Sequence, residues 1–467
     1  MKITFLGANR QVTGSRYCLE TDRARVLIDC GMFQERPYLD RNWATCPVPA
    51  SDFDAVVLTH AHIDHCGLLP RFVKDGFHNS IYCTRPTADL VEILLKDAAR
   101  IQVEDAKYKA KRHRKEGRQG KHPPVPLYDE QDAEATLPAL QGVTYNQPCQ
   151  VAPGMSVTFH EAGHILGSSS LELNVDDGTG STKRIVFSGD VGQWNKPIIR
   201  DPVPAVNTDY LVMESTYGDS LHEDHGDIGT QLADVINSTI RDGGNVIIPT
   251  FAVERAQELM YYIGQLAHDD RIPDVPIFLD SPMAVDVTET FYKHRDAFDE
   301  ATWNAIGSGK APLRFPGLRL VRSTEDSKRI NEFDQPCVIM STAGMCNAGR
   351  IKHHLRHNIV REECAVVFVG YQGVGTLGRE IKEGSREVRI HGRSYRVRAR
   401  IASIYGFSGH GDRDDLLRWS GQLDPAPKHV FLTHGEEPVA LALADTLRNK
   451  RNWNVSVPHY LESFTLE

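Results

Sequence analysis

The stretch His60-Ala61-His62-Ile63-Asp64-His65 places four side chains that can bind a metal ion within six residues. It follows the apolar run 55–58, which predicts a buried strand. Side chains two positions apart do not share a helix face, so the pattern predicts a loop that wraps around a metal ion. Imidazole and carboxylate ligands without a thiolate favour zinc, with manganese or iron as the competitors.

Six short apolar runs along the chain each end in a polar cluster, which is typical of buried strands in a layered α/β protein. The polar residues at these ends include, in chain order, Asp29, His60, Asp190, Glu214, Ser341 and His434. In such folds the loops at one edge carry the chemistry. We therefore expect one convergent polar site.

One loop cannot supply the ligands of two metal ions, and His164, Asp190 and His434 are the candidates that could complete them. Taken singly, each histidine has an ordinary structural explanation, and Asp190 could be a turn or cap residue. Two metal ions roughly 3.5–4 Å apart can activate a bridging hydroxide for in-line attack at phosphorus. That reaction needs an acid for the leaving oxygen, and Glu214 with His410 could form the carboxylate–imidazole pair that supplies it.

The ordered set of motifs resembles the β-CASP subfamily of nucleic-acid hydrolases in the metallo-β-lactamase superfamily. The stretch 60–65 matches the His-x-His-x-Asp-His motif of that superfamily, and the other matching motifs contain Asp29, His164, Asp190, Glu214, His410 and His434. The match covers nearly the whole chain and is similar to the prokaryotic relatives of the pre-mRNA 3′-end-processing endonuclease. It implies an α/β fold, namely an αββα sandwich interrupted by an inserted α/β β-CASP domain.

The resemblance also implies two zinc ions per chain, with Mn²⁺ as the alternative. The ligands of the first ion are implied to be His60, His62 and His164. Those of the second are implied to be Asp64, His65 and His434. Asp190 is implied to bridge the two ions, and Asp29 to support a ligand from behind, although Asp29 before Gly31 is also a typical turn residue.

Catalytic roles are implied for Asp64 and for Glu214 with His410 as an acid dyad near the scissile phosphate. A phosphate-contacting loop is implied at Ser341, Thr342 and the backbone of Gly344, for which a glycine-rich turn is the simpler interpretation.

His434 favours RNA as the substrate, because in this family His at that position accompanies RNA-acting members and Val the DNA-repair members. The resemblance thus implies a ribonuclease, endo- or exonucleolytic, that hydrolyses single-stranded RNA in RNA processing or decay with a metal-bridging hydroxide as nucleophile. Three alternatives remain open. They are a small-molecule metallohydrolase acting on thioesters or lactams, a DNA-specific β-CASP nuclease, and a non-catalytic scaffold that binds RNA.

Composition agrees with an ordinary globular protein of 467 residues, with 25% charged and 40% hydrophobic residues and a net charge of −9. These values exclude a coiled coil, a collagen-like chain and wholesale disorder. No apolar run approaches the roughly 20 residues of a membrane span. The nine scattered cysteines contain no Cys-x-x-Cys pair, and residues 1–7 predict a strand rather than a signal peptide. We therefore expect a cytoplasmic protein, with a homodimer as a further expectation.

Three segments are expected to make up the chain. Residues 1–208 form the N-terminal part of the metallo-β-lactamase domain, 209–385 the β-CASP domain, and 386–467 the C-terminal part of the first domain. The middle segment predicts helices over 227–241 and 256–266.

Two stretches, 107–121 and 379–400, are rich in Lys and Arg. Each is either a solvated helix face or hairpin, or a track for a nucleic-acid backbone.

Overall fold

The computed structural model describes residues 1–117, 119–176, 178, 182–204, 208–222, 226–373, 375–421 and 423–467. Arg118, within the basic stretch 107–121, lies outside the described residues. No helix in the described part of the chain has the length and apolar composition needed to cross a membrane.

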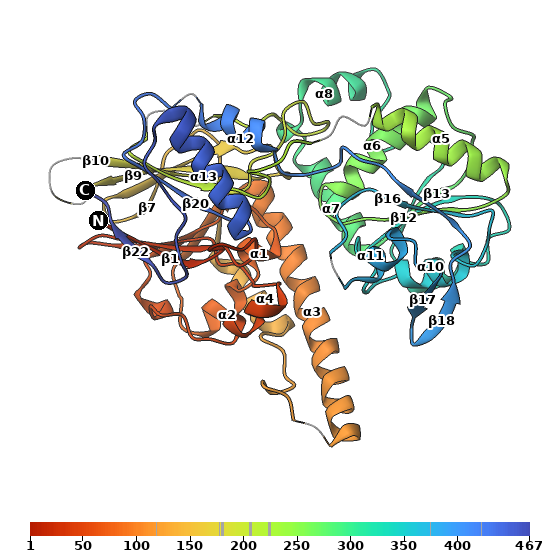
Figure 1. The fold of residues 1–467 in the computed structure, drawn as a ribbon, viewed down its shortest axis with the longest axis horizontal. Helices are drawn as coiled ribbons and strands as arrows, with labels where there is room; N and C mark the ends of the chain where they lie inside the picture. The colour runs from red at the N-terminus through yellow and green to blue at the C-terminus, as the bar shows by residue number, and fades with distance from the viewer. Residues whose placement is uncertain are drawn as a thin grey trace. The chain divides into compact units, whose positions relative to one another are not determined.

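The chain divides into two compact units, which Figure 1 shows with their element labels. Unit 1 contains Met1–Trp194, Asp201–Leu221 and His410–Glu467. Unit 2 contains Asn195–Arg200 and His222–Gly409. The domain limits at residues 208 and 385 stay predictions.

Unit 1 is built on two seven-stranded sheets. The first has the order β22 (Ser463–Thr465), β1 (Lys2–Gly7), β2 (Arg16–Glu20), β3 (Arg25–Ile28), β4 (Ala55–Val57), β5 (Ser80–Thr84) and β6 (Leu140–Val143). The second has the order β21 (Val455–Ser456), β20 (His429–Thr433), β11 (Tyr210–Glu214), β10 (Thr182–Phe187), β9 (Ser169–Asp176), β8 (Met155–Glu161) and β7 (Cys149–Ala152).

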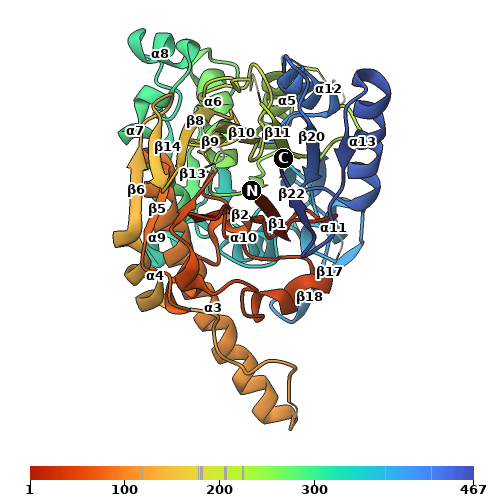
Figure 2. The same cartoon turned by 90° about the vertical axis from the view of Figure 1, so that its left-hand side faces the viewer.

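The two sheets of unit 1 pack face to face through apolar side chains such as Phe5, Val26, Phe159 and Phe431, all fully buried. The helices of this unit are α1 (Ile63–Cys66), α2 (Leu69–Lys74), α3 (Arg85–Glu116), α4 (Glu130–Thr136), α12 (Arg413–Ser420) and α13 (Glu437–Arg451), with 3₁₀ turns at Arg36–Asn42, Ala50–Asp52 and Leu137–Ala139. Helices α12 and α13 cover the outer face of the second sheet, beside β20 (Figure 2). The αββα sandwich is therefore confirmed.

Unit 2 is an α/β unit around a parallel six-stranded sheet. The sheet has the order β14 (Leu318–Val321), β13 (Ile277–Asp280), β15 (Val338–Ser341), β12 (Val246–Pro249), β16 (Ala365–Phe368) and β19 (Arg400–Ser403), and a separate hairpin joins β17 (Glu387–Ile390) to β18 (Arg393–Arg396). Its helices are α5 (Ile228–Arg241), α6 (Arg255–His268), α7 (Pro282–Lys293), α8 (Glu300–Gly307), α9 (Thr324–Ile330), α10 (Ile351–Asn358) and α11 (Leu377–Lys382), with a 3₁₀ turn at Arg295–Ala297. The helices predicted over 227–241 and 256–266 are confirmed as α5 and α6.

The strand directions in unit 1 explain why polar loops gather at one edge of each sheet. Strands β3 and β4 pair in parallel, and so do β10, β11 and β20. Parallel neighbours end at the same edge of a sheet, so the residues that follow them lie close together. Of the six apolar runs that end in polar residues, five belong to unit 1, and the sixth is β15 of unit 2.

Helix α3 carries residues 107–116 of the basic stretch at its C-terminal end, which extends beyond the rest of unit 1 (Figure 1). The Thr84 hydroxyl accepts a hydrogen bond from the Thr87 N–H at the start of the helix. The helix ends at Gly117, whose φ of 58° is the left-handed conformation that glycine adopts without strain.

Candidate metal centre

His60 and His62 lie in the loop after β4, as predicted, but Asp64 and His65 lie in helix α1, which begins at Ile63. His62 is the residue that precedes this helix, with an extended ψ of 146°. The chain therefore turns sharply between the two pairs of ligands. Residues 60–65 can therefore contribute side chains to two neighbouring groups of potential metal ligands.

Within the described residues, the side chains form three adjoining groups whose potential ligand atoms lie within 4.8 Å of one another. The first group contains His60, His62, His164 and Asp190, the second Asp64, His65 and His434, and the third Asp190, Glu214 and His410. All of these residues belong to unit 1. The structure thus brings together every predicted ligand and the predicted acid pair.

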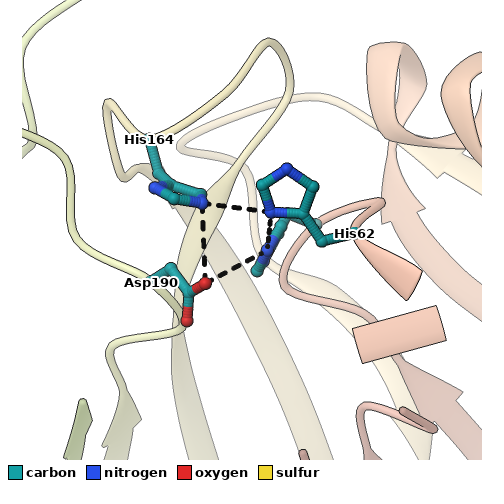
Figure 3. Close-up of side chains that lie close together, drawn as sticks. His62, His164 and Asp190 are labelled. Atoms are coloured by element: carbon teal, nitrogen blue, oxygen red, sulfur yellow. Dashed lines mark hydrogen bonds and ion pairs between the residues drawn. The ribbon is translucent and has the colours of Figure 1, made fainter. Parts of the chain in front are cut away.

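The first group is shaped like a metal site. His62 Nδ1 lies 3.1 Å from His60 Nε2 and 3.2 Å from His164 Nε2, and Figure 3 shows His62 and His164 converging with Asp190. A tetrahedral ion about 2.0–2.1 Å from its ligands separates them by about 3.3 Å. The two distances from His62 Nδ1 therefore match the ligand separation around one such ion.

Asp190 connects the first two groups through different oxygens. Its Oδ2 lies 3.4 Å from His60 Nε2 and 3.5 Å from His164 Nε2. Its Oδ1 lies 3.3 Å from His65 Nε2 and 3.6 Å from His434 Nε2. Oδ1 is also buried with no hydrogen-bond partner among the described residues. A buried carboxylate oxygen that lacks a hydrogen bond is costly unless a cation satisfies it.

Burial keeps the imidazoles of the first group neutral. It lowers the pKa of His60 to about 3 and that of His62 to about 4, and it holds the pKa of His164 well below its ordinary value. A neutral imidazole is the form that binds a metal ion. Although burial opposes ionisation of Asp190, the imidazoles of His434 and His65 hold the pKa of Asp190 well below its usual range.

Asp29 lies behind His65 and orients its ring. With a φ of 56° after β3, it places Oδ2 2.8 Å from His65 Nδ1. Its oxygens also accept hydrogen bonds from the Thr59 backbone N–H at 2.8 Å and the Thr59 hydroxyl at 2.9 Å. The carboxylate therefore holds the Nδ1 proton of His65 and leaves Nε2 facing Asp190.

His434 is fixed in the same manner by its own backbone and by Thr216. It follows β20 with a φ of 49°, and its N–H donates to the Ala8 carbonyl at 2.8 Å. The Thr216 hydroxyl donates to the His434 carbonyl at 3.0 Å and lies 3.0 Å from His434 Nδ1. With Nδ1 held in this way, Nε2 lies 3.4 Å from Asp64 Oδ2.

Glu214 and His410 form the predicted carboxylate–imidazole pair. His410 Nδ1 lies 3.1 and 3.2 Å from the two Glu214 oxygens. Glu214 is buried, and its Oε1 accepts the Val191 backbone N–H at 2.6 Å, one residue past Asp190. Although burial opposes it, the Glu214 charge raises the pKa of His410 to about 9. The His410 imidazole is therefore protonated at neutral pH.

The predicted phosphate loop lies in unit 2, where Ser341 ends β15. Ser341 is fully buried, and its hydroxyl donates to the Asp280 carbonyl at 2.9 Å. The Thr342 hydroxyl donates to the Ser281 hydroxyl at 2.9 Å. Both hydroxyls thus join β15 to the end of β13, and Gly344 follows in the same loop; a phosphate contact there stays a prediction.

Comparisons with known proteins place this geometry in a family. Family models match residues 18–192 as a metallo-beta-lactamase superfamily domain, 256–381 as a Beta-Casp domain, and 394–458 as a Zn-dependent metallo-hydrolase RNA specificity domain. A ribonuclease of Thermus thermophilus is 38% identical over 447 residues, which cover 96% of each chain. The chain belongs to the β-CASP family of metal-dependent ribonucleases with the metallo-β-lactamase fold.

A second β-CASP relative is the transcription termination factor FttA of Methanocaldococcus jannaschii, 32% identical over all of this chain and 72% of its own length. A crystal structure of an Enterococcus faecalis V583 protein of unknown function matches with a TM-score of 0.54 and 13% identity, over 99% of both chains. That likeness concerns the fold alone.

Two hydroxyl residues of this candidate metal centre were not among the predicted site residues. Thr59 contacts Asp29 and also lies 3.0 Å from His60 Nδ1, and Thr216 holds His434. Each stands beside a predicted residue in the sequence, since Thr59 precedes His60 and Thr216 is two positions after Glu214. A hydroxyl next to a ligand has no distinguishing spacing, so only the structure reveals its contacts.

Replacing Asp29 with asparagine should weaken metal binding by about 10- to 100-fold, the usual effect of losing the partner behind a ligand histidine. The amide keeps an oxygen for Thr59 but cannot hold the Nδ1 proton of His65 with a full charge. Competition with a chelator of known affinity measures the change. Asp54→Asn is the matched control, because the exposed Asp54 carboxylate accepts the Arg25 N–H outside the three groups. Equal metal affinity in Asp29→Asn and in the control would show that Asp29 does not affect metal binding.

Proposed function

We propose that this chain hydrolyses phosphodiester bonds of single-stranded RNA with two zinc ions held by the first two groups of side chains. The proposal rests on Asp190, because its Oδ2 faces the first group and its Oδ1 faces the second, and Oδ1 is buried with no hydrogen-bond partner in the described part of the chain. The donor set of imidazole and carboxylate without thiolate fits zinc, with Mn²⁺ as the competitor.

RNA is favoured over DNA and over small molecules by four features. The Thermus thermophilus relative is named a ribonuclease, and the C-terminal family model is named for RNA specificity. The position that distinguishes RNA-acting members holds His434, whose ring faces Asp64 and Asp190. A lactam or thioester substrate would not require the Glu214–His410 pair beside the metal groups.

The proposed mechanism assigns separate tasks to the side chains. When bound, two zinc ions would supply an activated water molecule and neutralise charge on the phosphate. Asp190, His60 and His434 are almost fully buried, so they exclude bulk water from one side of the centre. The Glu214 carboxylate holds Nδ1–H of His410, which leaves the Nε2 proton for the departing 3′-oxygen. The products would carry a 5′-phosphate and a 3′-hydroxyl.

The test of this function uses the purified protein, a 5′-labelled single-stranded RNA and DNA of the same sequence, each with and without chelator. We expect RNA to be cut, DNA to remain intact, and the chelator to stop cutting. A lactam chromophore and an aryl thioester are assayed alongside. Turnover of either with intact RNA would replace this proposal with a small-molecule hydrolase, and equal cutting of RNA and DNA would replace it with a general nuclease.

We also propose that the basic end of α3 binds the RNA backbone. Residues Lys107, Lys111 and Lys115 share one exposed face, four positions apart. Changing all three to Glu should raise KM, leave kcat unchanged and reduce the slope of log affinity against log salt by about 2. The control triple, with the same charge change at exposed sites elsewhere in unit 1, is Lys2→Glu, Arg23→Glu and Lys428→Glu. Equal salt slopes in the two triples would contradict this role.

The compartment and the oligomeric state belong to the same proposal. All nine cysteines are free thiols, which agrees with a reducing cytoplasm. A homodimer stays a prediction.

A further inference from the structure

Three exposed aromatic side chains follow neighbouring strands of the unit 2 sheet. Phe251 comes two residues after β12, Tyr371 three residues after β16, and Tyr405 two residues after β19. Their exposed fractions are 43%, 61% and 46%, which is unusual for large rings. We call these three residues the aromatic edge.

The sheet pairing brings the aromatic edge together. Strands β12 and β16 pair in parallel and lie side by side in Figure 1, and β16 pairs in parallel with β19. Adjacent strands are about 4.8 Å apart, and parallel strands end at the same edge. The carboxyl edge of a parallel sheet is where such folds bind ligands.

The aromatic edge adjoins the loop that contains Thr342 and Gly344. The ring of Phe251 lies against Gly344 so closely that a Cβ at that position would come within 2.9 Å of it. Gly373, two residues after Tyr371, faces the sulfur of Met345 in the same loop. The absence of a side chain at Gly344 therefore allows an aromatic ring to pack on the loop and still remain exposed.

Cationic groups accompany the rings. Lys382 Nζ lies 5.4 Å from the centre of the Tyr405 ring, and Arg379 is on the same helix, α11. Arg255 donates from Nη1 to the Val369 carbonyl at 2.6 Å, two residues before Tyr371. An exposed ring beside a lysine is complementary to a stacked base with an anionic backbone.

We propose that the aromatic edge stacks the bases of single-stranded RNA, with Lys382 and Arg379 next to its phosphates. Every base has a π face, so this surface would hold RNA with little regard to sequence. The inference rests on the proposed RNA cleavage but concerns binding by unit 2, which can be measured separately. Apolar partners such as a protein helix are less well matched, because two of the three rings carry hydroxyls and cations flank them.

The test measures binding of the metal-loaded protein to a fluorescent single-stranded RNA with hydrolysis-resistant phosphorothioate linkages. Phe251→Ala, Tyr371→Ala and Tyr405→Ala should each weaken binding by about 5- to 100-fold, the loss expected for one stacked base. Hydrolysis of bis(p-nitrophenyl) phosphate should stay unchanged. Trp303→Ala is the matched control, because Trp303 is also a large exposed ring, 42% exposed, but lies on α8 and follows no strand of the sheet.

Ring-preserving variants and a second RNA separate stacking from structural damage. Phe251→Tyr, Tyr371→Phe and Tyr405→Phe should bind RNA within about twofold of the unmodified protein, because a base stacks on either ring. An abasic RNA of the same length should bind the unmodified protein and the alanine variants equally. Alanine variants with unchanged affinity, or with equal losses for normal and abasic RNA, would overturn the inference. If the protein binds RNA but never cuts it, the proposed function fails while this series still decides the aromatic edge.

Discussion

Replacing His62 with alanine should reduce RNA cleavage by more than about 100-fold and lower the metal content of the purified protein. His62 Nδ1 is the nitrogen that faces both His60 and His164, so its loss leaves the first group with two imidazoles and one carboxylate. Loss of a residue that only orients a ligand already lowers metal affinity or activity by about 10- to 100-fold. Loss of a ligand itself should therefore cost more. Early-time RNA cleavage and elemental analysis of bound metal measure the two effects.

The control for His62→Ala is His160→Ala. His160 lies on β8 and pairs with Glu172 outside the three groups. Its replacement should leave metal content and cleavage unchanged. Circular dichroism should show both variants folded, because His62 lies in a loop and contributes little to the core between the sheets. Full activity in a folded His62→Ala protein would remove the first group from the mechanism.

Replacing His410 with alanine should lower kcat by about 100- to 10,000-fold while the metal content stays unchanged, which is the range for loss of a general acid. His410 is a member of neither of the first two groups, although its Nε2 lies 4.0 Å from Asp190 Oδ2 and its ring centre lies 4.5 Å from that of His164. A substrate with a p-nitrophenolate leaving group needs no proton. The deficit of His410→Ala should therefore shrink strongly on that substrate, and an equal deficit on both substrates would show that His410 is structural.

The pH dependence gives a second test of the same residue. The pKa of His410 is raised to about 9, so its acid form is present below that pH and is lost as the pH rises through it. RNA cleavage should fall above about pH 9, and the p-nitrophenyl substrate should lack this decline. In Glu214→Gln the amide oxygen still accepts the Val191 N–H, but the negative charge is gone. In this variant the decline of RNA cleavage should move to lower pH. A decline at the same pH as in the unmodified protein would mean that another group causes it.

Much of the centre could be predicted from the sequence, because its ligands are dense and follow strands. The spacing of residues 60–65 indicates a metal site directly. Parallel pairing places Asp29 and the residues after β4 at one edge of the first sheet, and Asp190 and His434 at one edge of the second. The prediction of a loop was wrong for Asp64 and His65, which lie in helix α1. A four-residue helix is too short to leave a periodic pattern in the sequence. The roles of Thr59 and Thr216 depend on tertiary hydrogen bonds, which no local pattern records.

Unit 2 was less predictable, although its helices α5 and α6 follow from sequence periodicity. Ser341 ends a buried apolar run, as the site residues of unit 1 do. Its hydroxyl, however, donates a hydrogen bond to the Asp280 carbonyl within the sheet. A strand-end hydroxyl has the same sequence signature in either role. The aromatic edge was also not predicted, because Phe251, Tyr371 and Tyr405 are far apart in the sequence and only the strand order makes them neighbours.

The most direct test of the account is a titration of the metal-free protein with zinc, in which RNA cleavage and bound metal are measured at each step. We expect no RNA cleavage without metal, and cleavage activity that rises with metal occupancy until two ions are bound per chain. His62→Ala should not recover activity at the same zinc concentrations. Cleavage of RNA by the metal-free protein, or full activity with no bound ion at these side chains, would contradict it.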